Sequence, residues 1–133
     1  MRYVASFLIL SLTLLLSPWS AYAHHSFAAE YDTDKPVQIT GTVTKVEWTN
    51  PHVHFYVDVK NNQGEVINWN IELGPPLILR HLGWRQDSLK TGDQVTVEGY
   101  LAKDQSNLAN AKKVTLADGR SVFAGSSAEK RGE

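Results

Sequence analysis

The chain contains no cysteine among its 133 residues. This absence excludes a disulfide framework and any site built on a thiolate. Basic residues are also few, since 13 Lys and Arg stand against 14 Asp and Glu, for a formal net charge of −1. Because proteins that bind nucleic acid carry a clustered basic face, we expect no nucleic-acid partner.

Only one apolar run is long, and it lies near the N-terminus. Residues 7–16 read FLILSLTLLL, which is too short to span a bilayer, since that needs about 20 residues. Arg2 precedes the run, and the small residues Ala21 and Ala23 follow it at the spacing that signal peptidase reads. The sequence therefore predicts a signal peptide over residues 1–23, a periplasmic or secreted protein, and no transmembrane segment after cleavage.

Removal of the first 23 of the 133 residues would leave 110, which suits one domain. Arg2 is the only charge lost, so 12 basic and 14 acidic residues would give the mature chain a formal charge of −2. We expect an extended N-terminal segment over residues 24–36, a folded domain over residues 37–124 and a disordered tail over residues 125–133.

Cleavage after Ala23 would place His24 at the mature N-terminus, followed by His25. The free α-amine and the imidazole of an N-terminal histidine can chelate one metal ion together. A further imidazole would complete the three-nitrogen set that Cu(II) favours, an arrangement termed a histidine brace. The sequence thus makes a metal ion, with copper favoured, the candidate cofactor. The alternative is that both histidines lie on a frayed, solvated terminus.

The clearest strand pattern follows Pro51. Apolar and polar residues alternate from Val53 to Val59, and this period of two is typical of a half-buried strand. His52 and His54 share the polar face, about 6–7 Å apart at a rise of about 3.3 Å per residue, so their imidazoles could lean toward one metal ion. They could equally be two polar residues on a solvated face. The candidate metal ligands are His24, His25, His52 and His54.

The other predicted elements surround this strand. A first strand should run from Val37 to about Trp48, with a bulge near Lys45 where the alternation changes phase, and residues 28–35 before it should be irregular. Further strands are expected over residues 66–73, 95–100 and 109–116, with a short edge strand over 121–123. Prolines and Gly83 bound a short helix over residues 77–82.

Three strands, a short helix and two strands follow the order of the OB-fold. We therefore predict an all-β fold, a five-stranded OB-fold-like Greek-key barrel with one short helix between strands 3 and 4. A small β-sandwich is the alternative. If the second and third strands pair, one face gathers a candidate ligand-binding surface, which consists of Trp48, Tyr56, Asn68, Asn70 and Glu72. This face could also be the solvated side of an antiparallel sheet.

Four stretches of the chain resemble a family of small exported bacterial proteins catalogued as a domain of unknown function. They are HHSFAAEYD over residues 24–32, GTVTKVEWTNPH over 41–52, LKTGD over 89–93 and LADGR over 116–120. The two stretches that contain histidines are specific, whereas LKTGD is common among OB-like barrels. The resemblance implies a periplasmic or secreted OB-like domain and brings no agreed activity with it.

Two functions follow from these patterns. The first is an exported metal-binding protein that uses His24 with His52 or His54. The second is a non-enzymatic module that binds an envelope oligosaccharide, a peptide or a partner protein on its polar face. No general acid or base stands beside the candidate site, so we assign no catalytic residue and expect no enzymatic activity. An oxidative copper enzyme is the third alternative, ranked below the other two.

Overall fold

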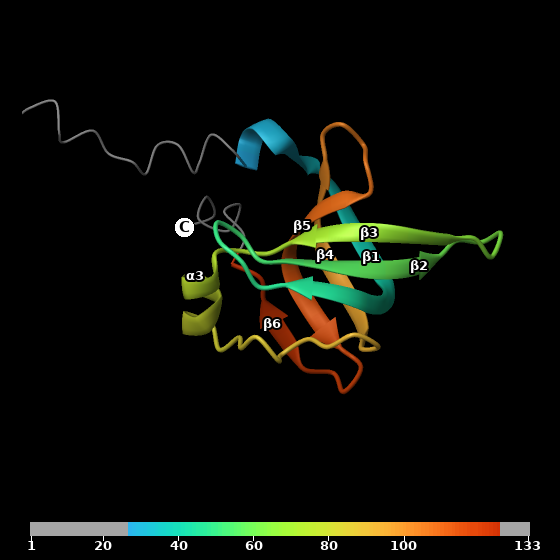
Figure 1. The fold of residues 1–133 in the computed structure, drawn as a ribbon. Coiled ribbons are helices and arrows are strands. Elements are labelled where there is room, and N and C mark those ends of the chain that lie inside the picture. The colour runs from blue at the N-terminus through green and yellow to red at the C-terminus, as the bar shows by residue number, and fades with distance from the viewer. Residues whose placement is uncertain (1–26, 126–133) are drawn as a thin grey trace, which may run out of the picture.

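Six strands and one short helix make up the part of the chain that the computed structural model describes, residues 27–125 (Figure 1). A helical turn over residues 27–30 precedes the first strand. The elements in chain order are β1 (Tyr31–Glu47), β2 (His54–Lys60), β3 (Val66–Glu72), α3 (Pro76–His81), β4 (Gln94–Ala102), β5 (Leu108–Leu116) and β6 (Ser121–Phe123). No helix in this part of the chain is long and apolar enough to cross a membrane.

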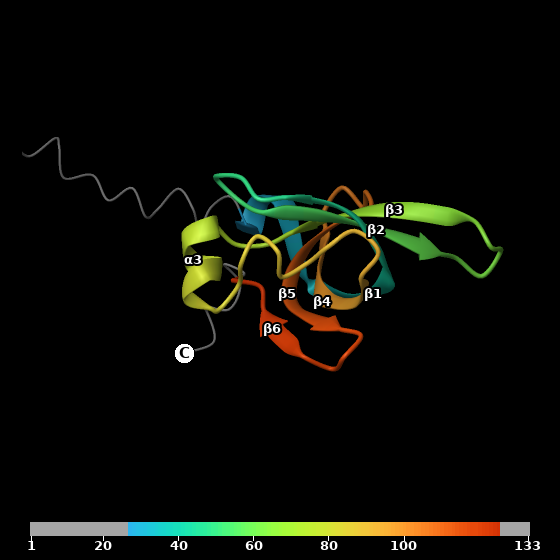
Figure 2. The same cartoon turned by 60° about the horizontal axis from the view of Figure 1, so that its bottom comes forward.

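The strands form one sheet that closes on itself. Their order is β3-β2-β1-β4-β5-β6, and an additional parallel pairing joins β3 to β5. This closing contact is short, because only residues 70–72 of β3 pair with residues 108–110 of β5. The hairpin of β2 and β3 extends beyond the barrel in both views (Figures 1 and 2). The predicted all-β, OB-like fold with a helix between strands 3 and 4 is confirmed, with β6 added at the edge of the sheet.

The bend of β1 lets one strand pair with two neighbours. Its first part pairs with β4 and its last part with β2, and the register with β2 shifts between Val43 and Lys45. This shift is the bulge that the change of phase predicted. Gly41 lies just before it, where a Cβ would come within 2.2 Å of the carbonyl oxygen of Asp58. Only glycine therefore permits this approach of β1 to β2.

β1 begins earlier than the sequence pattern indicated, at Tyr31 and not at Val37. Tyr31 pairs with Ala102 of β4, and Phe27 is buried with them in a small apolar cluster separate from the barrel core. The expectation of irregular chain over residues 28–35 is wrong. Charged residues interrupt the alternation there, so the local pattern does not reveal that two aromatic rings attach this segment to the barrel.

The barrel core consists of the inward-facing residues that alternation predicted. Val53, Phe55 and Val57 are fully buried, as are residues from every other main strand. The helix α3 contributes Leu79, and the loop after it contributes Trp84, whose Nε1 donates a 2.8 Å hydrogen bond to the carbonyl oxygen of Phe123. The helix and β6 are thereby joined at one end of the barrel.

We expect Gly41→Ala and Gly99→Ala each to lower the free energy of unfolding by about 1–3 kcal/mol. A Cβ at Gly99 would lie 2.1 Å from the carbonyl oxygen of Asn110, so the paired strands would have to separate in either variant. Urea unfolding measures the change. The control is Gln38→Ala, an exposed position in β1, which should change stability by less than about 0.5 kcal/mol. Alanine variants as stable as the wild type would contradict this close packing.

Candidate functional site

Glu72 lies at the seam that closes the barrel. It is the last residue of β3, and it pairs with His54 of β2 on one side and with Asn110 of β5 on the other. The residue is only 8% exposed. Because an isolated buried charge is very costly, an ionised carboxylate here requires hydrogen-bond donors around it.

Three donors from distant parts of the chain satisfy this carboxylate. The hydroxyl of Tyr31 donates to Oε2 at 2.9 Å, and Nδ2 of Asn110 donates to Oε1 at 3.0 Å. Nδ1 of His52, in the loop before β2, lies 3.3 Å from Oε1. The carboxylate thus connects β3 to β1, to β5 and to the loop between β1 and β2.

His54 completes the arrangement on the neighbouring strand. Its Nδ1 lies 2.8 Å from Oδ1 of Asn70, and its Nε2 lies 3.9 Å from Oε2 of Glu72, beyond hydrogen-bond length. An amide oxygen only accepts hydrogen bonds, so Nδ1 of His54 carries the proton. We name these six residues the Glu72 cluster: Tyr31, His52, His54, Asn70, Glu72 and Asn110.

Both imidazoles of the Glu72 cluster are held in the same way. In each ring Nδ1 faces an oxygen from β3, which is Oε1 of Glu72 for His52 and Oδ1 of Asn70 for His54. Histidines that bind metal through one nitrogen usually donate a hydrogen bond from the other nitrogen to such an oxygen. The arrangement therefore fixes the orientation of both rings and assigns Nε2 as the nitrogen that is left for a ligand.

The charges in the cluster shift one another's pKa values. Burial acts to raise the pKa of Glu72, but hydrogen bonds and charge from His52, the Tyr31 hydroxyl and His54 outweigh it, so the pKa is lowered. The hydrogen bond to Glu72 raises the pKa of His52 against the opposing effect of its partial burial. Burial and the adjacent carboxylate raise the pKa of Tyr31, which stays neutral. Such mutually shifted groups are more frequent at functional sites than elsewhere.

The beginning of the described chain lies on this cluster. Tyr31 is 2% exposed and packs against Phe27, with ring centroids 5.4 Å apart. The carbonyl oxygen of Glu30 accepts a 2.8 Å hydrogen bond from the backbone N–H of Lys103. Burial and the charge of Glu72 raise the pKa of Glu30, and the charges of His52 and His54 lower it. The Glu30 carboxylate is therefore close enough to interact electrostatically with the Glu72 cluster.

The rest of the predicted ligand-binding face lies along the β2–β3 hairpin or beside it. The hydroxyl of Tyr56 donates to Oε2 of Glu47 at 3.0 Å, and Nδ2 of Asn68 donates to Oδ1 of Asp58 at 2.7 Å. Trp48 packs partly buried against the barrel core, and its buried Nε1 has no hydrogen-bond partner among residues 27–125. This part of the face consists mostly of side chains that already bond to one another.

The structure brings together some of the residues that the sequence singled out and not others. His52, His54, Asn70 and Glu72 meet in one cluster, whereas His24 and His25 lie outside the described residues. Tyr31 and Asn110 were missed, since no local pattern connects either of them to β3. Within residues 27–125 no three His, Asp or Glu side chains are grouped so as to hold a metal ion.

We expect Tyr31→Phe to lower the free energy of unfolding by about 1.5–3 kcal/mol, because a hydrogen bond to a buried carboxylate is lost. The matched control is Tyr56→Phe, which removes a hydroxyl bonded to Glu47, a residue that is not buried. That change should cost less than about 1 kcal/mol. Urea unfolding of both variants at neutral pH makes the comparison, and equal losses would contradict the special role of Tyr31.

We expect the stability difference between the wild type and His52→Gln to depend on pH. Because the pKa of Glu72 is lowered in the folded state, its carboxylate stabilises the fold at pH values above its ordinary pKa of 4.5. This stabilisation is lost as the pH falls through the folded-state pKa of Glu72. Because the pKa of His52 is raised in the folded state, its imidazolium stabilises the fold at pH values below its ordinary pKa of 6.5. This stabilisation is lost as the pH rises through the folded-state pKa of His52.

The difference should therefore be largest between about pH 4.5 and 6.5. Thermal unfolding at a series of pH values measures it. The control is His81→Gln at the exposed end of α3. Its stability difference from the wild type should show no maximum in this pH range. A pH-independent difference for His52→Gln would show that no ion pair with Glu72 forms.

Two solved structures of one protein are similar to this chain in fold. Both are crystal forms of the mitochondrial single-stranded DNA binding protein Rim1 from S. cerevisiae. One has a TM-score of 0.49 and 15% identity and covers 62% of this chain and 93% of that chain. The other has a TM-score of 0.48 and 17% identity and covers 62% and 92%. No curated protein matches the chain.

A family model matches residues 13–111, which is more than half of the chain. The match includes β1 to β4, the helix α3 and the Glu72 cluster. The whole cluster thus lies within the matched region, whereas the end of β5 and β6 follow it. The chain belongs to this family, which is described as a family of unknown function (DUF6152).

Proposed function

We propose that this protein is exported to the periplasm or secreted, and that it binds a metal ion, with copper favoured. The ligands would be the α-amine and imidazole of His24 together with the imidazoles of His52 and His54, and His25 would be a further nearby donor. The single observation that carries this proposal is the shared orientation of the two strand histidines. Each is held through Nδ1 by an oxygen of β3, which leaves Nε2 for a metal.

The position of the N-terminal segment supports the same proposal. Tyr31 is bonded to Glu72, and the carboxylate of Glu30 interacts with both strand histidines. His24 precedes Phe27 by three residues, a length of chain that spans at most about 10 Å. Since the described residues do not supply three ligands by themselves, the N-terminal amine and imidazole are the donors that would complete the set.

The chemistry of these donors favours copper over the harder cations. Imidazole and amine nitrogens suit Cu(II), Ni(II) and Zn(II), whereas Mg²⁺ and Ca²⁺ take oxygen ligands, and Cu(II) binds such sites most tightly. In this proposal Glu72 and Asn70 bind no metal themselves but position the two rings. The ion is the ligand of the protein, and we propose no reaction for it.

A non-enzymatic binding module is the second candidate. The observation that favours it is the half-exposed face of the β2–β3 hairpin that carries Tyr56, Asp58 and Asn68. An envelope oligosaccharide, a peptide or a partner protein would bind there. A nucleic acid fits this face poorly, because Asp58 lies on it and would repel phosphates, and Lys45 over the Tyr56 ring is already paired with Glu47.

A copper titration of the secreted protein, with its N-terminus read by intact mass, tests the metal proposal. We expect one Cu(II) per chain, and we expect one extra residue before His24 to weaken binding at least tenfold, because the chelating amine is then moved. His52→Ala with His54→Ala should also weaken binding at least tenfold. The control is His81→Ala, which removes an exposed imidazole outside the cluster and should leave affinity unchanged.

The role of Glu72 is tested in the same titration. We expect Glu72→Gln to lower affinity by about 10–100-fold, the usual effect of removing the group that orients a metal-binding histidine. Unchanged affinity after the N-terminal extension would disprove the brace. Unchanged affinity after loss of both strand histidines would remove the strand from the site, and the module would then be the better proposal.

A further inference from the structure

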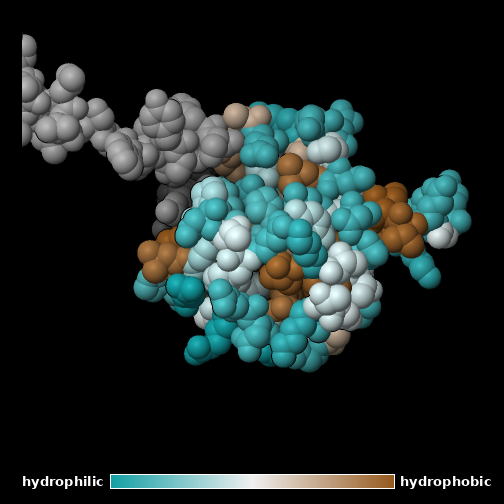
Figure 3. All heavy atoms as spheres, viewed as in Figure 1, coloured by the Kyte–Doolittle hydropathy of each residue, from teal (hydrophilic) through white to brown (hydrophobic). Residues whose placement is uncertain are grey.

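The helix α3 exposes apolar side chains to solvent. Leu77 is 62% exposed, Ile78 40% and Leu82, directly after the helix, 43%. The space-filling view shows this apolar surface at the α3 end of the molecule (Figure 3). Three large apolar side chains are thus exposed within six residues, and such a group marks a candidate interaction surface.

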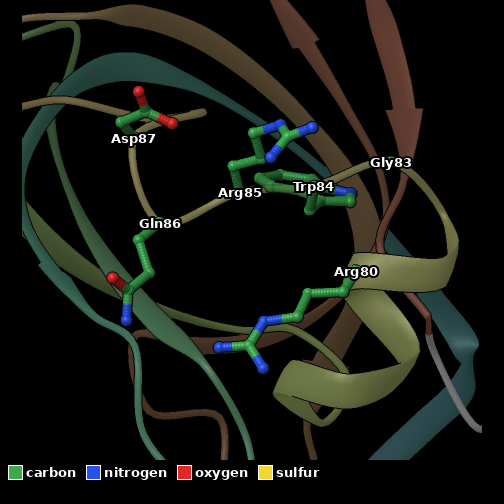
Figure 4. A pocket seen from close by; sticks show the side chains of 6 residues that line it. All are labelled: Arg80, Gly83, Trp84, Arg85, Gln86 and Asp87. Atoms are coloured by element: carbon green, nitrogen blue, oxygen red, sulfur yellow. The ribbon is translucent and has the colours of Figure 1, made fainter.

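A basic pocket lies at the C-terminal end of α3. It has a volume of ≈620 Å³ and is lined by Arg80, Gly83, Trp84, Arg85, Gln86 and Asp87. Arg85 lies on one side of it with Trp84 beside it, and Arg80 lies on the opposite side (Figure 4). Neither guanidinium forms an ion pair with any residue between 27 and 125. Asp87 is the one acid in the lining, so the two arginines give the pocket a positive charge.

We propose that α3 and this pocket dock on the surface of a membrane that contains anionic phospholipids. The α3 face, defined as Leu77, Ile78, Arg80, Leu82 and Arg85, combines the two features that such a surface recognises. The apolar side chains enter the interfacial region, and the arginines bind lipid phosphates, which match the planar guanidinium group. This inference is independent of the proposed metal site, because it uses none of the same residues.

Charge complementarity selects this partner. The whole chain has a formal net charge of −1, so its overall field does not attract an anionic surface. Attraction must therefore come from a local group of cations, and Arg80 in α3 and Arg85 in the loop after it line one pocket together. Such a combination of basic and apolar side chains is typical of segments that lie in the membrane interface.

Two other occupants fit the α3 face less well. The C-terminal residues 126–133 begin near it, since a Cβ on Gly125 would lie 3.4 Å from Cγ2 of Ile78. Their sequence, SSAEKRGE, has Ala128 as its one apolar residue and so lacks side chains that could cover two leucines. A stable protein partner usually buries about 800 Å² per side with a complementary shape, whereas a lipid surface adapts to a small projecting group.

Co-sedimentation of the secreted protein with vesicles, its N-terminus read by intact mass, tests this proposal. The probes are vesicles of phosphatidylcholine alone and vesicles that also contain phosphatidylglycerol. We expect at least tenfold stronger binding to the anionic vesicles, and weaker binding as the salt concentration rises. Leu77→Asp with Leu82→Asp should weaken binding at least tenfold, as should Arg80→Gln with Arg85→Gln.

The matched control is Gln63→Asp with Val66→Asp, which adds the same two negative charges at exposed residues of the distant β2–β3 hairpin and should bind as the wild type does. Urea unfolding checks that each variant is folded. If the variant with both leucines replaced does not fold, the variant with both arginines replaced decides the outcome. Equal binding by all variants, or no binding of the wild type to anionic vesicles, would overturn the proposal, and the second result would point to a protein partner.

Discussion

The buried charge of Glu72 is the constraint on which the arrangement of the polar face depends. An ionised carboxylate at the seam of β3 and β5 is stable only if donors surround it, because removing one partner leaves a buried charge uncompensated. Those donors come from β1, from the loop before β2 and from β5. Closure of the barrel, attachment of the N-terminal segment and orientation of His52 are therefore coupled through one side chain.

The apolar core and the Glu72 cluster occupy separate parts of the barrel. Inward-facing apolar residues fill the core, where Phe55 and Val57 are fully buried. Outside the core, the apolar cluster of Phe27, Tyr31 and Ala102 brings the beginning of the described chain to the Glu72 cluster. A polar cluster supported on one side by β3 and on the other by a packed aromatic segment has little freedom to rearrange, and such pre-organisation is what a binding site requires.

Several elements could be predicted from the sequence because their signals are local. Alternation from Val53 to Val59 gave the correct inner and outer faces of β2, and the change of phase near Lys45 corresponds to the bulge in β1. The prolines and Gly83 predicted a helix over residues 77–82, within one residue at each end of the observed Pro76–His81. By contrast, residues 28–35 were misread, since the packing of Tyr31 against Ala102 depends on a strand seventy residues further along the chain.

The sequence by itself determined the faces of the strands, the position of the turns and the pairing of His52 and His54 on one face, because a period of two requires only neighbouring residues. It placed Glu72 on that face but gave no indication that it is buried. The tertiary structure alone decided this, since Tyr31 and Asn110, which donate to the carboxylate, are 41 and 38 positions away from it. Contacts over such distances leave no periodic signal, because they arise only when the barrel closes.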